Sequence, residues 1–299
     1  MQLIRLIFFG NYFYGICAVA LSIEANLQQR YPLNSIWYYI AAFAATVVYY
    51  TIAYKTDAAP DINNRRSVWY AEHKALVKFT QAFFFLIIIA YAIYFLTNNY
   101  KGFLQFTFAE WLLAAAFPIA GILYYGLNSK LIGSYNLRRI GWLKPFVIGF
   151  TWAGLVNIYP ILVNCIENHT NYTFSQVGVF LFIKNFMFVT VLCIMFDIKD
   201  YAVDHNLRLK TFVVQNGLRK TIFYILLPLC FLGLASFIYY GLTHHFHPMK
   251  ILLNIVPFAV LIWVAHSMHK RRPILYYLII IDGIMLVKAL CGTIAMTYF

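Results

Sequence analysis

Residues 191–211 read VLCIMFDIKDYAVDHNLRLKT, an apolar run that ends in three aspartates and a short basic tail. The apolar run begins near residue 177, and a helix of about 20 apolar residues is long enough to span the hydrocarbon core of a bilayer. The segment therefore predicts a membrane-spanning helix whose charged end emerges at one membrane surface.

The three aspartates are spaced for one side of a helix. Asp197, Asp200 and Asp204 stand at i, i+3 and i+7, so they share one stripe if the helix continues through them. Carboxylates at such a short separation repel each other, and divalent cations bound between them relieve the repulsion. Because Mg²⁺ prefers one or two carboxylates together with phosphates and waters, the stripe predicts a Mg²⁺-diphosphate site, with Arg208 and Lys210 as diphosphate contacts. The alternative is a solvated helix end whose acids offset nearby Lys and Arg.

The composition extends the membrane prediction to the whole chain. Of the 299 residues 63% are hydrophobic and 11% charged, which excludes a water-soluble single domain, and the 19% of aromatic residues exclude disorder. Nine apolar segments are long enough to cross a bilayer, and they leave no room for a separate soluble domain. The segments are 3–23, 35–54, 79–97, 108–126, 143–163, 177–197, 221–241, 250–268 and 273–296. We predict an all-α polytopic membrane bundle of about nine helices that forms one domain over residues 1–299.

The charged residues predict an orientation. The loops after the second, fourth, sixth and eighth segments hold 17 of the 23 Lys and Arg residues, and the loops on the other side hold three. Such an excess marks cytoplasmic loops, so the net charge of +13 does not indicate a nucleic-acid partner. We expect a multi-pass integral membrane protein with a cytoplasmic N-terminus and an outside C-terminus, in the inner or cytoplasmic membrane of a bacterium.

The segment 197–211 resembles the second aspartate motif of the UbiA-type intramembrane prenyltransferases. In that motif D-x-x-x-D precedes a short basic stretch that ends in Lys-Thr or Lys-Ser. Here Asp200 and Asp204 match the pair, Asp197 matches an extra upstream acid seen in many members, and Lys210–Thr211 match the tail. The nine segments agree with the fold of that family.

A second stretch carries a weaker resemblance to the same family. Residues 137–145 (LRRIGWLKP), which run into 150–154 (FTWAG), are similar to the basic loop and the start of its fifth helix. Arg138, Arg139 and Lys144 in this stretch are further candidate diphosphate contacts.

The first motif of the family, N-x-x-x-D-x-x-x-D, is degenerate, and two registers are open. In one, Asp57 and Asp61 are its metal-binding aspartates, with Ala53 in place of the Asn and Pro60 between them. Proline disfavours a continuous helix through the second of these positions. In the other register residues 50–54 (YTIAY) occupy the metal-binding turn, and both acids are lost.

The resemblance implies an enzyme, a transferase of alkyl groups other than methyl. The expected reaction is Mg²⁺-dependent transfer of an isoprenyl group from a prenyl diphosphate to a lipophilic acceptor such as a quinone precursor or another lipid, with Asp200 and Asp204 as catalytic residues. The alternative is a non-catalytic relative that binds an isoprenoid or a polar lipid. A secondary transporter is a third possibility, although the sequence shows no internal repeat.

Two further charged residues lie within apolar segments. Asp282 is an ionisable group in the middle of the ninth segment, and such a group is a functional candidate by default. A structural hydrogen bond to a neighbouring helix explains it equally well. Lys184 lies near the outer end of the sixth segment, where we expect its side chain to snorkel towards the membrane surface.

Overall fold

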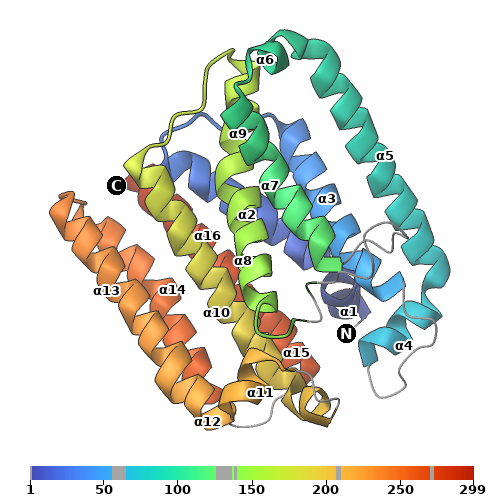
Figure 1. The fold of residues 1–299 in the computed structure, drawn as a ribbon, viewed down its shortest axis with the longest axis vertical. Coiled ribbons are helices and arrows are strands. Elements are labelled where there is room, and N and C mark those ends of the chain that lie inside the picture. The colour runs from blue at the N-terminus through green and yellow to red at the C-terminus, as the bar shows by residue number, and fades with distance from the viewer. Residues whose placement is uncertain (1, 56–64, 126–136, 138–139, 207–209, 270–272) are drawn as a thin grey trace.

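The chain folds as a bundle of helices, shown in Figure 1. The structure, a computed structural model, describes residues 2–55, 65–125, 137, 140–206, 210–269 and 273–299, and these contain helices and no strand. The first half comprises α1 Gln2–Phe9, α2 Tyr12–Gln28, α3 Ile36–Lys55, α4 Arg65–Glu72, α5 Lys74–Asn98, α6 Tyr100–Gln105 and α7 Phe108–Tyr125. The second half comprises α8 Lys144–Ala153, α9 Tyr159–Glu167, α10 Gln176–Asn206, α11 Phe212–Asn216, α12 Leu218–Lys220, α13 Leu227–Thr243, α14 Pro248–Ser267, α15 Ile274–Tyr276 and α16 Asp282–Tyr298.

In the part of the chain that the structure describes, three of the long helices contain a π-helical turn. These turns are η2 Gly154–Ile158 between α8 and α9, η3 Thr221–Leu226 before α13, and η4 Tyr277–Ile281 before α16. Pro160 and Pro228 follow the first two turns closely, and a proline cannot donate the regular hydrogen bond of an α-helix. The local sequence therefore accounts for two of the three turns.

The length and composition of the helices are consistent with an integral membrane protein. Among the described residues, six helical stretches are long and apolar enough to cross a membrane, or seven if the bent pair α1–α2 counts as one span. They are Lys74–Asn98, Lys144–Glu167, Gln176–Tyr201, Leu218–Thr243, Pro248–Ser267 and Ile274–Tyr298. The second and fourth predicted segments form the shorter apolar helices Ile36–Ile52 and Phe108–Tyr124. All nine predicted segments are thus helical, whereas a count of nine membrane crossings remains a prediction.

The bend between α1 and α2 is a local event at Gly10 and Asn11. The two helices meet at 62°, and Asn11 adopts the left-handed conformation with φ of 65°. Arg66 of α4 donates to the carbonyl oxygens of Phe8 and Phe9 at the end of α1, where a cation is favoured by the helix dipole. A distant basic residue therefore stabilises the break in the first span.

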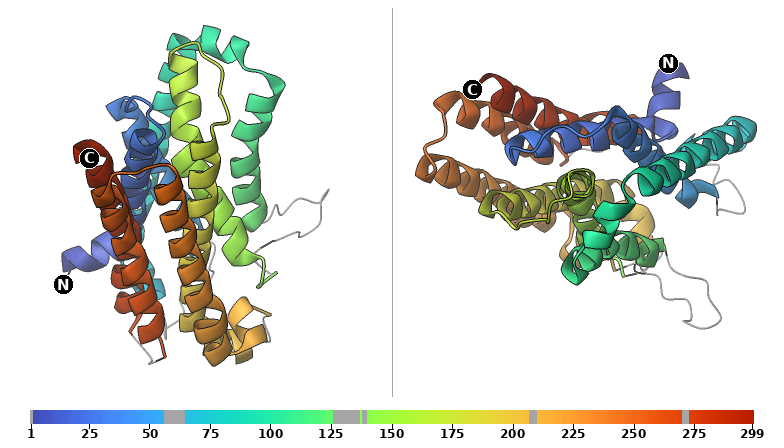
Figure 2. Two further views of the ribbon diagram at one scale, coloured as in Figure 1. Left: turned by 90° about the vertical axis from the view of Figure 1, so that its left-hand side faces the viewer. Right: turned by 90° about the horizontal axis from the view of Figure 1, so that it is seen from above.

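The helices lie in two rows, which Figure 2 shows from above. One row contains α16, α2 and α3, and the other contains α13, α10 and α8, with α14 packed on both α13 and α16. Met195, Leu21 and Ile281 lie almost completely buried between the rows. We call the end of the bundle where α8 begins and α10 ends the acidic end. The turn between α13 and α14 lies at the opposite end (Figure 1).

Candidate functional site

The stripe of aspartates lies on a continuous helix, as the sequence predicts. Helix α10 extends through Asn206, so Asp197, Asp200 and Asp204 occupy one side of the same helix at the acidic end. The side chain of Asp197 is completely buried, whereas that of Asp200 is 42% exposed. The side chain of Asp204 lies outside the described residues.

Each described carboxylate of the stripe has a lysine beside it. Lys144, the first residue of α8, places its Nζ atom 2.6 Å from Oδ1 of Asp197. Lys199 places its Nζ atom at the same distance from Oδ1 of Asp200. The second oxygen of Asp197, Oδ2, is buried and accepts no hydrogen bond from the residues that the structure describes. Lys144, predicted as a diphosphate contact, is therefore bound to an aspartate of the stripe.

The two segments that carry the family resemblance lie against each other. A Cβ atom at Gly141 would approach the carbonyl oxygen of Lys210 to 2.6 Å, so the absence of a side chain allows this contact. The side chain of Lys210 is exposed, and Thr211 caps α11 by accepting a hydrogen bond from the Val214 amide at 3.4 Å. The predicted contacts Arg138, Arg139 and Arg208 lie outside the described residues.

The degenerate first motif is described only in part. Asp57 and Asp61 lie outside the described residues, so neither register is tested. Near the end of α3, the Tyr50 hydroxyl oxygen accepts a hydrogen bond from the Trp152 indole at 2.5 Å, and the Thr51 hydroxyl oxygen accepts one from the Asn11 amide at 3.1 Å. The described part of α3 therefore presents hydroxyl and aromatic groups at this level.

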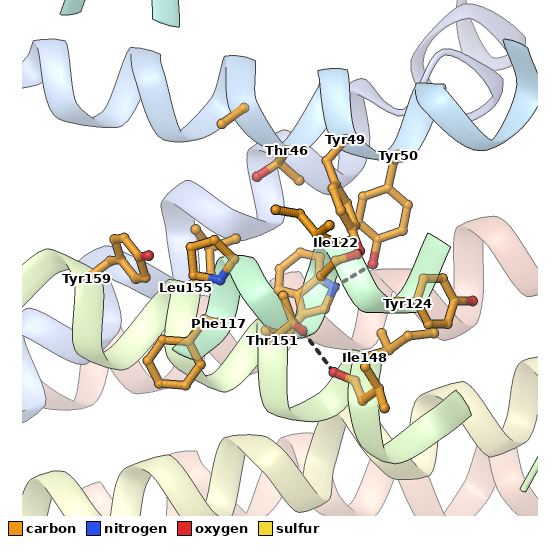
Figure 3. Close-up of a pocket in the computed structure, with 15 residues that line it drawn as sticks. Thr46, Tyr49, Tyr50, Phe117, Ile122, Tyr124, Ile148, Thr151, Leu155 and Tyr159 are labelled. Atoms are coloured by element: carbon orange, nitrogen blue, oxygen red, sulfur yellow. Dashed lines mark hydrogen bonds between the residues drawn. The ribbon is translucent and has the colours of Figure 1, made fainter. Parts of the chain in front are cut away.

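A cavity of about 400 Å³ opens between α3, α7 and α8 (Figure 3). Its volume lies in the usual range of small-molecule sites. It is lined by Ala45, Thr46, Tyr49, Tyr50, Phe117, Pro118, Gly121, Ile122, Tyr124, Val147, Ile148, Thr151, Trp152, Leu155 and Tyr159. We call it the aromatic cavity.

Three hydroxyl groups of the aromatic cavity donate to backbone carbonyl oxygens. The Tyr49 hydroxyl donates to the carbonyl oxygen of Gly121 at 3.1 Å, and the Thr151 hydroxyl donates to that of Val147 at 2.9 Å. Tyr159 donates to the carbonyl oxygen of Ala114. These bonds leave an apolar surface rich in ring faces, which suits an unsaturated hydrocarbon chain.

Lys144 connects the aromatic cavity to the acidic stripe. Val147 and Ile148 of the cavity wall follow it by one helical turn, and Tyr124 is near enough to interact with it electrostatically. The same lysine forms the ion pair with Asp197. An amphiphile with its chain in the cavity would therefore have its polar end near the carboxylates of α10.

A buried polar network lies behind the cavity, and the sequence showed only one member of it. Asp282, at the start of α16, is buried and lies close enough to the Tyr14 hydroxyl to interact with it electrostatically. Tyr14 in turn stacks on Tyr50, with ring centroids 4.4 Å apart. Arg66 interacts electrostatically with Asp282 and hydrogen-bonds the side chain of Asn11. Asp282 is thus surrounded by polar groups from other helices, which no periodicity in the sequence reveals.

A second buried ion pair was missed entirely. Glu24 of α2 and Lys288 of α16 lie 2.7 Å apart, with side chains 1% and 4% exposed. Their segments are far apart in the chain, so spacing within one helix could not pair them. The signal available was that Glu24 directly follows the first predicted segment and Lys288 lies in the ninth, both away from the acidic end.

The described carboxylates fit one type of Mg²⁺ site and not another. Among the described residues no three His, Cys, Asp or Glu side chains converge as a metal-binding group, so an all-protein cage is not present there. Asp197 has a carboxylate oxygen without a partner in that part of the chain, and Asp200 is reachable from solvent. One or two carboxylates are sufficient where phosphate oxygens and water complete the coordination.

Comparison with known proteins adds no assignment to this geometry. No protein-family model matches the chain, and no curated protein or solved structure was found to match it.

Proposed function

We propose that this protein is a membrane prenyltransferase, which transfers an isoprenyl group from a prenyl diphosphate to a lipophilic acceptor with Mg²⁺. The observation that carries the proposal is the position of the aromatic cavity next to the acidic stripe. Lys144 is one helical turn from the cavity wall and 2.6 Å from Asp197. An apolar chamber that ends at carboxylates matches a substrate with a hydrocarbon chain and a diphosphate end.

In this proposal the two ends of the donor are bound by different residues. Asp197, Asp200 and Asp204 would hold Mg²⁺, which would supply positive charge to the diphosphate leaving group. Lys210 and Lys144 contact the diphosphate, and Arg138, Arg139, Arg208, Asp57 and Asp61 complete the proposed set. Lys144 is paired with Asp197, so in this proposal its ammonium group contacts both the Asp197 carboxylate and the diphosphate of the donor.

In this proposal the allylic cation forms and reacts with the acceptor in the aromatic cavity. The bond between the allylic carbon and the diphosphate oxygen breaks, and its electron pair leaves with the diphosphate. The faces of Trp152, Tyr49 and Phe117 can stabilise the allylic cation and exclude water. The acceptor then forms a bond to the allylic carbon and releases a proton.

We propose the nine-span topology with the acidic end in the cytoplasm as the setting of this reaction. The excess of basic residues in the loops on that side supports the orientation. Donor and Mg²⁺ would then enter from the cytoplasm, and the acceptor would enter from the bilayer of a bacterial inner membrane.

Purified protein with isotope-labelled geranylgeranyl diphosphate, Mg²⁺ and a lipid extract as acceptor tests the reaction. The variants Asp200→Asn and Asp204→Asn should lower formation of labelled product about 100-fold, the scale seen when a group that stabilises a transition state is removed. Glu72→Gln, which changes an exposed acid at the end of α4, is the matched control and should retain turnover. Unchanged Mg²⁺-dependent turnover in both aspartate variants would refute the role given to the pair.

One observation favours the non-catalytic alternative. Asp197 is already neutralised by Lys144, and the described residues hold no metal-binding group of three. A relative that binds a prenyl lipid in the aromatic cavity without metal would need neither a free carboxylate at Asp197 nor a metal-binding group. Binding of geranylgeraniol that is independent of Mg²⁺, with no turnover of any prenyl diphosphate, would favour that function.

A further inference from the structure

A second cavity, of about 260 Å³, lies between α10, α13 and α14. It shares no lining residue with the aromatic cavity. Its wall includes Phe180, Met187, Phe188, Leu229, Gly233 and Leu261. The wall also carries two polar side chains, Lys184 and Ser236, and the Ser236 hydroxyl donates to the carbonyl oxygen of Leu232 at 2.7 Å. The ammonium group of Lys184 is therefore the distinctive polar feature of an otherwise apolar chamber, which we call the Lys184 cavity.

The position of Lys184 along α10 separates this cavity from the acidic end. The residue is eight positions from the first residue of α10, which places it about 12 Å along the helix at 1.5 Å per residue. Asp197 follows 13 residues later, about 20 Å farther along. Lys184 therefore lies at hydrocarbon depth in the half of the bundle away from the acidic stripe.

The ammonium group is directed inwards instead of snorkelling. Its Nζ atom lies 5.4 Å from the centroid of the Phe237 ring, in the range of a cation–π contact. Within the described part of the chain, Lys184 forms no ion pair and no side-chain hydrogen bond. A cation at this depth without a counter-ion is costly.

Glu24, an acid that interacts with this charge, cannot balance it because its carboxylate is already bound to other side chains. Glu24 interacts electrostatically with Lys184, but its Oε2 atom binds Lys288 at 2.7 Å and its Oε1 atom accepts a hydrogen bond from Gln28 at 2.9 Å. Lys288 is itself a cation, and it lies behind Phe188, 5.9 Å from the ring centroid of that residue of the cavity wall. Two lysines and one glutamate leave a surplus of one positive charge beside the cavity.

We propose that the Lys184 cavity binds a single-chain lipid with an anionic headgroup. The headgroup pairs with the Lys184 ammonium, and the chain lies along the apolar side chains of α10, α13 and α14. Charge complementarity selects the anion, because an ion pair supplies the counter-ion that the protein lacks. The volume, slightly below the usual range of ligand pockets, favours one chain over two. The proposal is independent of the prenyltransferase function because the two cavities are separate.

Laurate, with dodecanol as the neutral analogue of the same chain length, tests the proposal in detergent solution by thermal unfolding. Laurate should raise the Tm of the wild type and of Lys101→Gln, a matched change of an exposed lysine in α6. In Lys184→Gln the concentration of laurate that gives half of the shift should rise at least about tenfold, which corresponds to about 1.4 kcal/mol. Without ligand, Lys184→Gln should melt no lower than the wild type because it removes an unbalanced charge. An equal response of Lys184→Gln to laurate, or an equal response of the wild type to dodecanol, would overturn the proposal.

A measurement on the unaltered chain guards against a variant that fails to fold. A fatty acid with a photoreactive diazirine in its chain is cross-linked to the wild type, and the modified peptides are identified by mass spectrometry. The expected adducts lie in residues 180–191 and 229–236, and excess laurate should suppress them. Adducts that are confined to other helices, or that laurate does not reduce, would rule the site out.

Discussion

Lys144 and Asp197 form an ion pair at the acidic end. They belong to consecutive antiparallel segments, and each lies at the acidic end of its helix. Both residues were candidates for the site on sequence grounds, and their placement at one membrane level could be predicted. Their direct contact could not be predicted, because it depends on how α8 and α10 are rotated about their axes relative to each other. The rotation of each helix about its axis is set by packing of side chains from both helices, so the sequence of one helix shows no pattern that predicts it.

Removing one partner of this pair should be far worse than removing both. Lys144→Met leaves Asp197 buried without its cation, which should cost about 3 kcal/mol of stability and lower the Tm clearly. The double variant Lys144→Met/Asp197→Leu should recover most of that loss. Thermal unfolding of the two single variants and the double variant provides the comparison, and additive effects would contradict a direct interaction between the two residues.

Gly292 tests the second buried pair. A Cβ atom at this position would overlap Oε1 of Glu24, so Gly292→Ala should displace the carboxylate from Lys288. We expect a loss of about 1 to 3 kcal/mol, the usual cost of overpacking. Gly283→Ala in the same helix is the control, because nothing lies within 4 Å of its Cβ position. It should be neutral or slightly stabilising, and equal melting of the two variants would show that the close approach is absent.

At the scale of the elements, the sequence predicted helices well and their ends less well. All nine apolar segments are helical, because a continuous apolar stretch in a bilayer must satisfy its backbone hydrogen bonds internally. The bend at Gly10–Asn11 was missed, since it is stabilised by Arg66 from a separate helix. The continuation of α10 beyond Asp200 was predicted only conditionally, and the structure confirms it.

The start of α7 contains a capping box that makes a separate prediction. The Glu110 carboxylate accepts hydrogen bonds from the Thr107 amide at 2.8 Å and the Thr107 hydroxyl at 2.7 Å, and another from the Tyr172 amide. Glu110→Ala removes the acceptor of all three hydrogen bonds and should cost about 1 to 2 kcal/mol. Glu167→Ala is the control, since within the described chain its carboxylate accepts no hydrogen bond. Thermal unfolding should place Glu110→Ala clearly below Glu167→Ala, and the reverse order would contradict the capping role.

At the scale of the whole molecule, composition and loop charge predicted an all-helical membrane bundle. The aromatic cavity could not be placed from sequence, because its wall combines α3, α7 and α8, and aromatic residues occur throughout the chain. The Lys184 cavity also required the structure, since the sequence suggested a snorkelling lysine. Tertiary packing decides which apolar surfaces are covered by other side chains and which line a cavity, and the periodicity of the sequence does not reveal this.

The topology makes a prediction about the termini. The basic loops predict a cytoplasmic N-terminus and, with nine crossings, a C-terminus on the other side. Alkaline phosphatase fused after Phe299 should be active in a bacterial host, because the enzyme needs the oxidising periplasm, whereas the same fusion after residue 269 should be inactive. The opposite pattern would invert the proposed orientation and move the acidic end away from the cytoplasm.

The most direct test of the central claim is cross-linking with a prenyl diphosphate that carries a photoreactive group at the far end of its chain. The account predicts Mg²⁺-dependent adducts in residues 45–50, 117–124 and 147–155, the walls of the aromatic cavity. Removal of Mg²⁺ with a chelator, or the double variant Asp200→Asn/Asp204→Asn, should abolish them. Adducts outside these walls, or adducts within them that persist without Mg²⁺ and without the two aspartates, would contradict the account.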